Sequence, residues 1–222
     1  MRLPATDPVP DHYLGLWRRT RLRSAGRIDT STQVFWLQSR QWHVDLRIPA
    51  DRPDFAGVSR LADCNAAQLH WLLGQSGFAG LTRVEGEVCE WLRQLDYRPS
   101  GERDIARMVF HGDAVEEFGL EADYDEWWER EPQGGGEVDC QVVQQDGRLA
   151  SVTARAGQWL MHCRPRAMPI AAEQAAWASV QAGGASIDSL RALADFELSL
   201  AEADSGLIRL STLPWREGQR LG

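Results

Sequence analysis

The sequence predicts an all-β protein built as two tandem antiparallel β-barrels, each with one short helix. Three observations support this class: apolar and polar residues alternate as in strands, several motifs recur after half the chain, and no alternating strand–helix pattern is present. The expected domains are residues 1–112 and 113–222. With 222 residues, the chain is long enough for two small domains.

An internal duplication is the most informative feature of the sequence. Residues 13–19 and 124–130 both read Y-x-x-x-W-x-R, and they lie 111 residues apart. Two further motifs recur in the same order, at 41–47 and 158–164 and at 66–71 and 171–177. The spacings between motifs differ by a few residues, as changes in loop length would produce. We therefore expect two diverged copies of one unit.

In the first copy, period-two alternation predicts strands over 33–38 and 42–48. The second of these places Trp42, Val44, Leu46 and Ile48 on one face and polar residues on the other. Asn65 is a suitable cap for a helix over 66–73, which ends before Gly74. Further strands are expected within 81–97 and 103–111.

In the second copy, strands over 138–145 and 148–155 flank Asp146-Gly147, which suits a two-residue hairpin loop. A third strand follows over 158–164, and an alanine-rich helix over 171–181. The last strands are expected over 195–201 and 206–212. No strand–helix–strand succession appears, which argues against Rossmann and TIM-barrel folds.

The charge distribution differs between the two halves. The net charge is −8, and all 24 basic residues are arginine. Residues 1–111 hold 15 arginines and 13 acids, giving +2, whereas 112–222 hold 9 arginines and 19 acids, giving −10. The overall acidity argues against nucleic-acid binding. We expect the acidic segment 113–131 to be a solvated connection that runs into the next strand.

Several other classes of protein are not indicated. The four cysteines form no C-x-x-C motif, no metal-ligand spacing occurs, and the hydrolase, nucleotide-binding and dinucleotide-binding motifs are absent. We therefore expect no cofactor and no metal. The chain has no long apolar run and no apolar leader at its N-terminus, so we expect a cytoplasmic protein without membrane contact. The sequence does not fix the oligomeric state.

Gly15-Leu16-Trp17 lies on the first expected strand. Together with many antiparallel strands, this G-x-W element resembles the calycin superfamily of lipocalin-like barrels, in particular its uncharacterised double-barrel members. The resemblance implies that Trp17 lies near the closed end of a barrel, with an arginine from a late strand packed over it. Arg107 is the positional candidate. In the second copy, Glu126 replaces the glycine and only Trp128 is kept.

The ten tryptophans are expected to anchor strands in the barrel core. The functional alternative is that some of them line a cup for a small, partly apolar or anionic ligand, bound without turnover. The residues expected to contact such a ligand are Trp17, Arg19, Trp36, Trp42, Glu87, Trp91 and Arg93. The arginine run over 18–27 is otherwise expected to be a solvated outer face.

Two other functions remain open. His43, Asp45 and Arg47 share one strand face, and in an enzyme His43 or Glu87 would act as a base with Arg47 or Arg19 holding an anion. Polar alternation of this kind is more typical of an outward face, so we expect these side chains to point to solvent. The third possibility is a protein-interaction module that uses the acidic second half as its surface.

Overall fold

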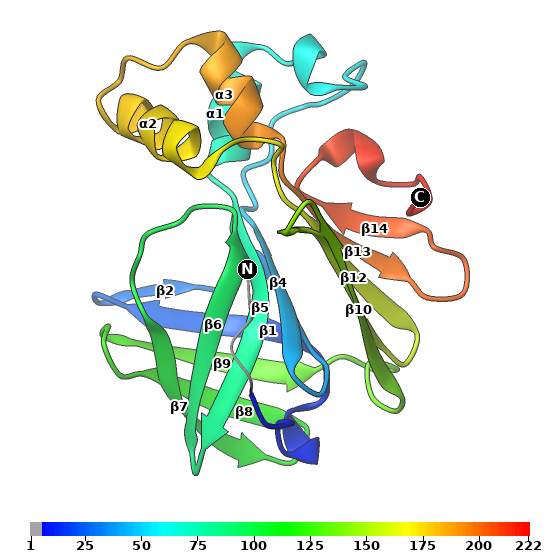
Figure 1. The fold of residues 1–222 in the computed structure, drawn as a ribbon. Helices are drawn as coiled ribbons and strands as arrows, with labels where there is room; N and C mark the ends of the chain where they lie inside the picture. The colour runs from blue at the N-terminus through cyan, green and yellow to red at the C-terminus, as the bar shows by residue number, and fades with distance from the viewer. Residues whose placement is uncertain (1–5) are drawn as a thin grey trace.

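In the computed structural model, a closed β-barrel lies beside a second β-sheet, and three α-helices pack together next to both (Figure 1). The structure describes residues 6–222. Residues 1–5, on which the expectation about an N-terminal leader partly rests, lie outside the described residues. The all-β class with a closed antiparallel barrel is confirmed.

The barrel is a nine-stranded antiparallel sheet that closes because β9 also pairs with β1. Neighbouring strands follow the order of the chain, and β2 only extends one end of the β1 hairpin. The strands are β1 (Gly15–Ser24), β2 (Arg27–Asp29), β3 (Gln33–Gln38), β4 (Trp42–Ile48), β5 (Ser76–Glu85), β6 (Val88–Asp96), β7 (Asp104–His111), β8 (Ala114–Gly119) and β9 (Tyr124–Arg130). Closure leaves no free edge in the ring of eight strands.

The expected domain boundary after residue 112 falls inside this barrel. Strands β8 and β9 follow the boundary, yet β9 supplies the partner that β1 needs on its second edge. The two Y-x-x-x-W-x-R motifs therefore lie on paired strands of one barrel, with Arg19 opposite Trp128. The acidic segment 113–131, which we expected to be a solvated connection, forms these two strands instead.

The second half of the chain forms a five-stranded antiparallel sheet in place of the second barrel expected there. Its strands are β10 (Val138–Gln145), β11 (Arg148–Ala156), β12 (Trp159–Arg164), β13 (Glu197–Glu202) and β14 (Ile208–Ser211). Asp146 and Gly147 have φ angles of 52° and 73°, which confirms the predicted hairpin. Within the described residues this sheet stays open, with β10 and β14 at its edges.

Both predicted helices are confirmed. They are α1 (Ala66–Leu73) and α2 (Ile170–Gln181), and the Asn65 side chain caps α1 by accepting from the Gln68 N–H. A third helix, α3 (Ile187–Ala194), was not expected; Ser186 caps it. Three short 3₁₀ helices complete the described chain, namely η1 (Asp11–Tyr13), η2 (Leu61–Asp63) and η3 (Pro214–Arg216).

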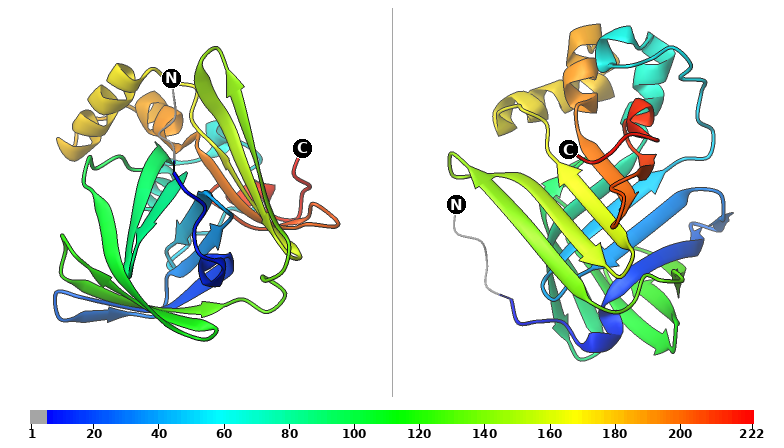
Figure 2. Two further views of the ribbon diagram at one scale, coloured as in Figure 1. Left: turned by 60° about the horizontal axis from the view of Figure 1, so that its bottom comes forward. Right: turned by 90° about the vertical axis from the view of Figure 1, so that its right-hand side faces the viewer.

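The second sheet packs against the outside of the barrel at β3 and β4, which reverses the expected orientation of β4 (Figure 2). Val44, Leu46 and Ile48 face outward into a core shared with residues of β11 and β13 such as Val152 and Leu198. Each such side chain contributes about 1.5–3 kcal/mol on full burial. The apolar face of β4 is therefore outside the barrel, and its polar face points into the barrel.

Gly77 on β5 permits the close approach of the two layers. Its φ angle is +146°, and an added Cβ would lie 2.4 Å from the Asp45 carbonyl oxygen and 2.5 Å from Leu198 Cδ1. Only glycine meets both conditions without displacement of a neighbour.

Four tryptophans fill one end of the barrel. Trp36 lies at the centre, with ring centroids 6.1 Å from Trp17, 5.7 Å from Trp91 and 5.9 Å from Trp128. Tyr13 of η1 adds its ring to the same cluster. The structural anchoring expected of these tryptophans is thus observed, and this end of the barrel is filled by its own side chains.

An arginine does pack over Trp17, but it is Arg130 of β9 and not Arg107. The Arg130 guanidinium carbon lies 4.0 Å from the Trp17 ring centroid, and its nitrogens donate to the carbonyl oxygens of Leu14 and His12. Arg107 lies on the outside of β7, where it covers the Phe118 ring. The candidate was wrong because the last strand of the barrel comes after the boundary we had expected.

Candidate functional site

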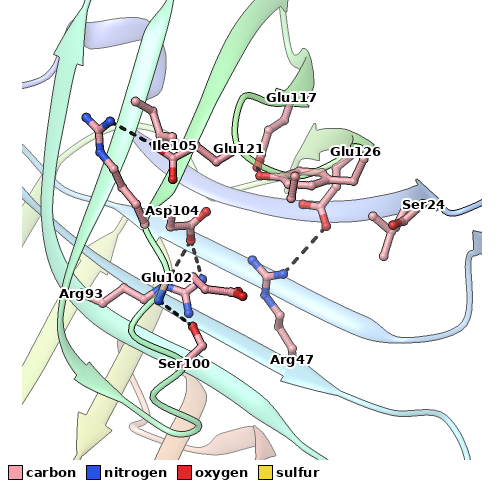
Figure 3. A pocket seen from close by; sticks show the side chains of 14 residues that line it. Ser24, Arg47, Arg93, Ser100, Glu102, Asp104, Ile105, Glu117, Glu121 and Glu126 are labelled. Atoms are coloured by element: carbon pink, nitrogen blue, oxygen red, sulfur yellow. Dashed lines mark hydrogen bonds and ion pairs between the residues drawn. The ribbon is translucent and has the colours of Figure 1, made fainter.

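The open end of the barrel contains a cavity of about 290 Å³ (Figure 3). Its walls come from β1, β4, β6, β7, β8 and β9 and from the loops that join β6 to β7 and β8 to β9. The charged side chains that line it most deeply are Arg47, Arg93, Asp104, Glu117 and Glu126, and Tyr124 lies beside them. The cavity is therefore polar and carries charges of both signs.

The tryptophan cluster forms the floor below this polar layer. A void of about 10 Å³, large enough for about one water molecule, is lined by Trp36, Trp91 and Trp128 on one side and by polar groups such as Glu117 on the other. Among the residues that the structure describes, no tryptophan lines the larger cavity. The cavity begins where the aromatic filling of the barrel stops.

Glu117 and Glu126 form a pair of buried carboxyl groups on one wall. They are 4% and 2% exposed, and their Cα atoms lie directly opposite each other on β8 and β9. Burial raises the pKa of Glu117 well above its usual value, and the neighbouring Glu126 raises it further. Burial also raises the pKa of Glu126, while Arg47 and Arg19 oppose that effect.

The hydrogen bonds of the two carboxyl groups differ. Glu117 accepts from the Tyr124 hydroxyl at 2.8 Å and from the Trp128 indole N–H at 3.0 Å. Glu126 Oε1 accepts from Arg19 at 2.6 Å, whereas its Oε2 is buried and has no hydrogen-bond partner in the structure. An unsatisfied buried acceptor costs about 1–3 kcal/mol, so this oxygen is available to a donor in the cavity.

The arginines that line the cavity are already paired with carboxylates. Arg93 donates to Asp104 at 2.6 Å and to Asp96 at 3.1 Å. Arg47 holds Asp45 through two hydrogen bonds, at 2.8 and 3.2 Å, and its Nη1 lies 3.8 Å from Glu126. Figure 3 shows Arg93 with Asp104 on one side and Arg47 pointing to Glu126 on the other.

His43 lies inside the barrel, but it lines neither cavity. The Thr82 hydroxyl donates to Gln38 at 2.8 Å and lies 3.0 Å from His43 Nδ1, so Nδ1–H donates to Thr82. The Nε2 atom is then an acceptor without a partner. Burial, aided by Arg93, lowers the pKa of His43 to about 3, which keeps the ring neutral at physiological pH.

Comparison with known proteins gives little beyond the fold. No protein-family model matches the chain, and no curated protein matches it. A crystal structure of an uncharacterized protein from Saccharomyces cerevisiae is similar, with a TM-score of 0.53 and 13% sequence identity over 89% of this chain and 84% of that one. At this identity the likeness concerns the fold alone.

The structure brings only some of the predicted site residues together. Trp17, Trp36 and Trp91 lie in the aromatic floor, Arg93 lines the cavity, and Arg19 reaches Glu126 from β1. The remaining two lie elsewhere: Trp42 is on the outer face of β4 in the core shared with the second sheet, and Glu87 is exposed in the turn between β5 and β6.

The side chains of Asp104, Glu117, Tyr124 and Glu126 were missed by the sequence analysis. A usable pattern was present, because Tyr124, Glu126 and Trp128 alternate with more exposed residues, as do Val115 and Glu117. The high density of acids concealed this alternation. His43, Asp45 and Arg47 were noticed, but they point inward and not to solvent as expected, since the second sheet covers the other face of β4.

Over residues 6–222, no three or more His, Cys, Asp or Glu side chains are grouped so as to hold a metal ion. None of the helices in this range has the length and apolarity to span a membrane.

Proposed function

We propose that this protein binds a small polar molecule in the open end of its barrel, without chemical turnover. The observation that supports this most strongly is the cavity of about 290 Å³ at the point where the aromatic filling stops. This volume is near the lower end of the range of about 300–1,000 Å³ for ligand pockets. Eight-stranded barrels have room either for their own side chains or for one small ligand.

The way the cavity is built also favours binding. Its deepest polar groups stand on strands of a closed sheet, and several are held by hydrogen bonds to neighbouring side chains, such as Glu117 by Tyr124 and Trp128. A site whose groups are already fixed loses little conformational entropy when a ligand enters. The partly apolar ligand considered from the sequence would need exposed tryptophan rings, so a polar ligand suits this cavity better.

We also propose that the barrel is calycin-like. The closed antiparallel ring, G-x-W on β1, and an arginine from the last strand over Trp17 are the features that the resemblance implied. The second sheet need not derive from a second copy of the barrel, because the two repeated Trp motifs pair with each other within one barrel.

The test is a screen of small polar compounds against the full chain, followed by ¹H–¹⁵N spectra. We expect at least one compound to shift the Trp128 indole N–H resonance, because this group donates to Glu117 at the cavity wall. The Trp71 indole, which donates to Asp51 on the helical side, is the internal control and should not move. If no compound at millimolar concentration shifts resonances of the cavity walls, the proposal fails.

A further inference from the structure

We propose that the ligand of this cavity is an organic cation, an amine or a guanidine, whose positive group lies against Glu117 and Glu126. This inference rests on the proposed binding function and names the class of ligand. It reverses the sign of the charge that the sequence suggested for the ligand.

One wall of the cavity carries a facing pair of carboxyl groups. Glu117 and Glu126 are direct cross-strand neighbours on the inner face of the barrel, where like charges repel. Arg19 is the only guanidinium that the structure places within hydrogen-bond distance of either carboxyl group. Arg47 Nη1 lies 3.8 Å from Glu126, but Arg47 is also paired with Asp45, and Arg19 is also paired with Asp29. A further positive charge would therefore relieve the repulsion between the two acids when both are ionised.

The same wall carries a buried acceptor without a hydrogen-bond donor. Glu126 is 2% exposed, it lines the cavity, and its Oε2 atom has no hydrogen-bond partner. An N–H donor of a ligand would satisfy this atom, and a charge-assisted bond of this kind is about twice as strong as a neutral one. The unpaired Glu126 Oε2 atom and the two facing carboxyl groups therefore lie on the same wall of the cavity.

The arginines that line the cavity are already paired with carboxylates of the protein. Arg93 is bound to Asp104 and Asp96, and Arg103 at the rim is bound to Glu90 and Glu121. Arg47 is bound to Asp45 through its Nε and Nη2 atoms, and its Nη1 lies 3.8 Å from Glu126. An anionic ligand would have to displace one of these carboxylates, whereas a cation displaces none.

The experiment compares three probes of similar size on the full chain. They are n-butylguanidinium, its neutral analogue n-butylurea, and the anion pentanoate. Titration is followed by calorimetry and by the Trp128 indole resonance. We expect n-butylguanidinium to bind at least tenfold more tightly than n-butylurea, which corresponds to about 1.4 kcal/mol, and pentanoate to bind more weakly than both.

Variants test the assignment of the acids. Glu117→Gln is expected to weaken n-butylguanidinium at least tenfold and to leave n-butylurea within about twofold. Glu126→Gln is a second variant with the same expectation, and Arg19 keeps Asp29 as a partner in it. Glu129→Gln, an exposed acid on the outer face of β9, is the matched control and should change neither affinity.

The outcomes separate the two proposals. If n-butylurea or pentanoate binds as tightly as n-butylguanidinium, or if the cation binds equally well to both glutamine variants, the cationic class is refuted and the binding function stands. If none of the three probes binds while the broader screen finds other ligands, the cationic class is likewise refuted. If neither the probes nor the screen gives any binding, the proposed function itself fails.

Discussion

The guanidinium of Arg130 lies over the ring of Trp17 and so ties the last strand of the barrel to the first. The same side chain donates to the carbonyl oxygens of His12, within the short helix η1, and of Leu14, directly after it. One residue thus joins the closing strand, the aromatic cluster and the segment that leads into β1. The closed state of the barrel depends on this junction as well as on the β1–β9 hydrogen bonds.

Replacement of Arg130 by alanine is expected to lower the free energy of unfolding by about 2–4 kcal/mol, because a cation–π contact and two hydrogen bonds are lost together. Urea denaturation followed by tryptophan fluorescence measures this loss. Arg107→Ala is the control, since Arg107 makes only an exposed cation–π contact with Phe118 on the outside of the barrel, and it should cost about 1 kcal/mol or less. Equal losses in the two variants would contradict the assigned role of Arg130.

Replacement of Glu117 by glutamine is expected to stabilise the protein at neutral pH by about 0.5–2 kcal/mol. Burial raises the pKa of Glu117 in the folded state above the value of an unfolded glutamate, 4.5. Above pH 4.5, the folded state therefore holds this proton more strongly than the unfolded state does. The stability of the unmodified protein then falls as pH rises through this range. The gain from Glu117→Gln should therefore grow from pH 5 to pH 8.

Chemical denaturation at both pH values measures this gain, with Glu129→Gln as the control for loss of one acidic charge. A gain that is the same at pH 5 and pH 8, or a loss of stability at pH 8, would show that Glu117 is not held in a proton-retaining environment.

Binding of n-butylguanidinium is expected to tighten as pH rises from 5 to 8, by up to about tenfold per pH unit below the pKa of Glu117. The cation favours ionised Glu117, so binding releases a proton. Glu126, Asp104, Arg47 and Tyr124 also act on this carboxyl group. Calorimetry in buffers of different ionisation enthalpy measures the proton released, and Glu117→Gln should abolish most of it. Affinity that is independent of pH would contradict the prediction.

Replacement of Gly77 by alanine is expected to cost about 2–4 kcal/mol, since the added methyl group would meet the Asp45 carbonyl oxygen and Leu198 Cδ1. The contact with Leu198 makes this variant a test of the packing between barrel and second sheet. Gly86→Ala is the matched control: its φ angle is also positive, +61°, but nothing lies within 4 Å of the added atom. It should cost only about 1–2 kcal/mol, so similar losses would argue against close packing at Gly77.

Local elements of the fold could be predicted from the sequence because their causes are local. The Asn65 cap and the Asp146-Gly147 turn depend on a few adjacent residues, and both were predicted correctly. The pairing of β9 with β1 joins residues at least a hundred positions apart, and the sequence of neither strand indicates which strand it pairs with. The expected boundary after residue 112 failed for this reason.

The candidate site was predictable only in part. Alternation correctly grouped His43, Asp45 and Arg47 on one face of β4, but it could not say which face is inside. That depended on the second sheet, which covers the apolar face with residues such as Leu198. Glu117 and Glu126 were overlooked because buried acids are rare, and an acidic run is usually solvated.

The second sheet supports the barrel at β3 and β4. Strand β4, which carries Arg47, lies between two cores, whereas no layer formed by residues 6–222 packs on the outer faces of β8 and β9, which carry Glu117 and Glu126. The β8–β9 hairpin should therefore move to accommodate ligands of different size, while β4 keeps its position. Cations that share a head group and differ in their tails would then all bind in the cavity, because one hairpin moves to fit each tail.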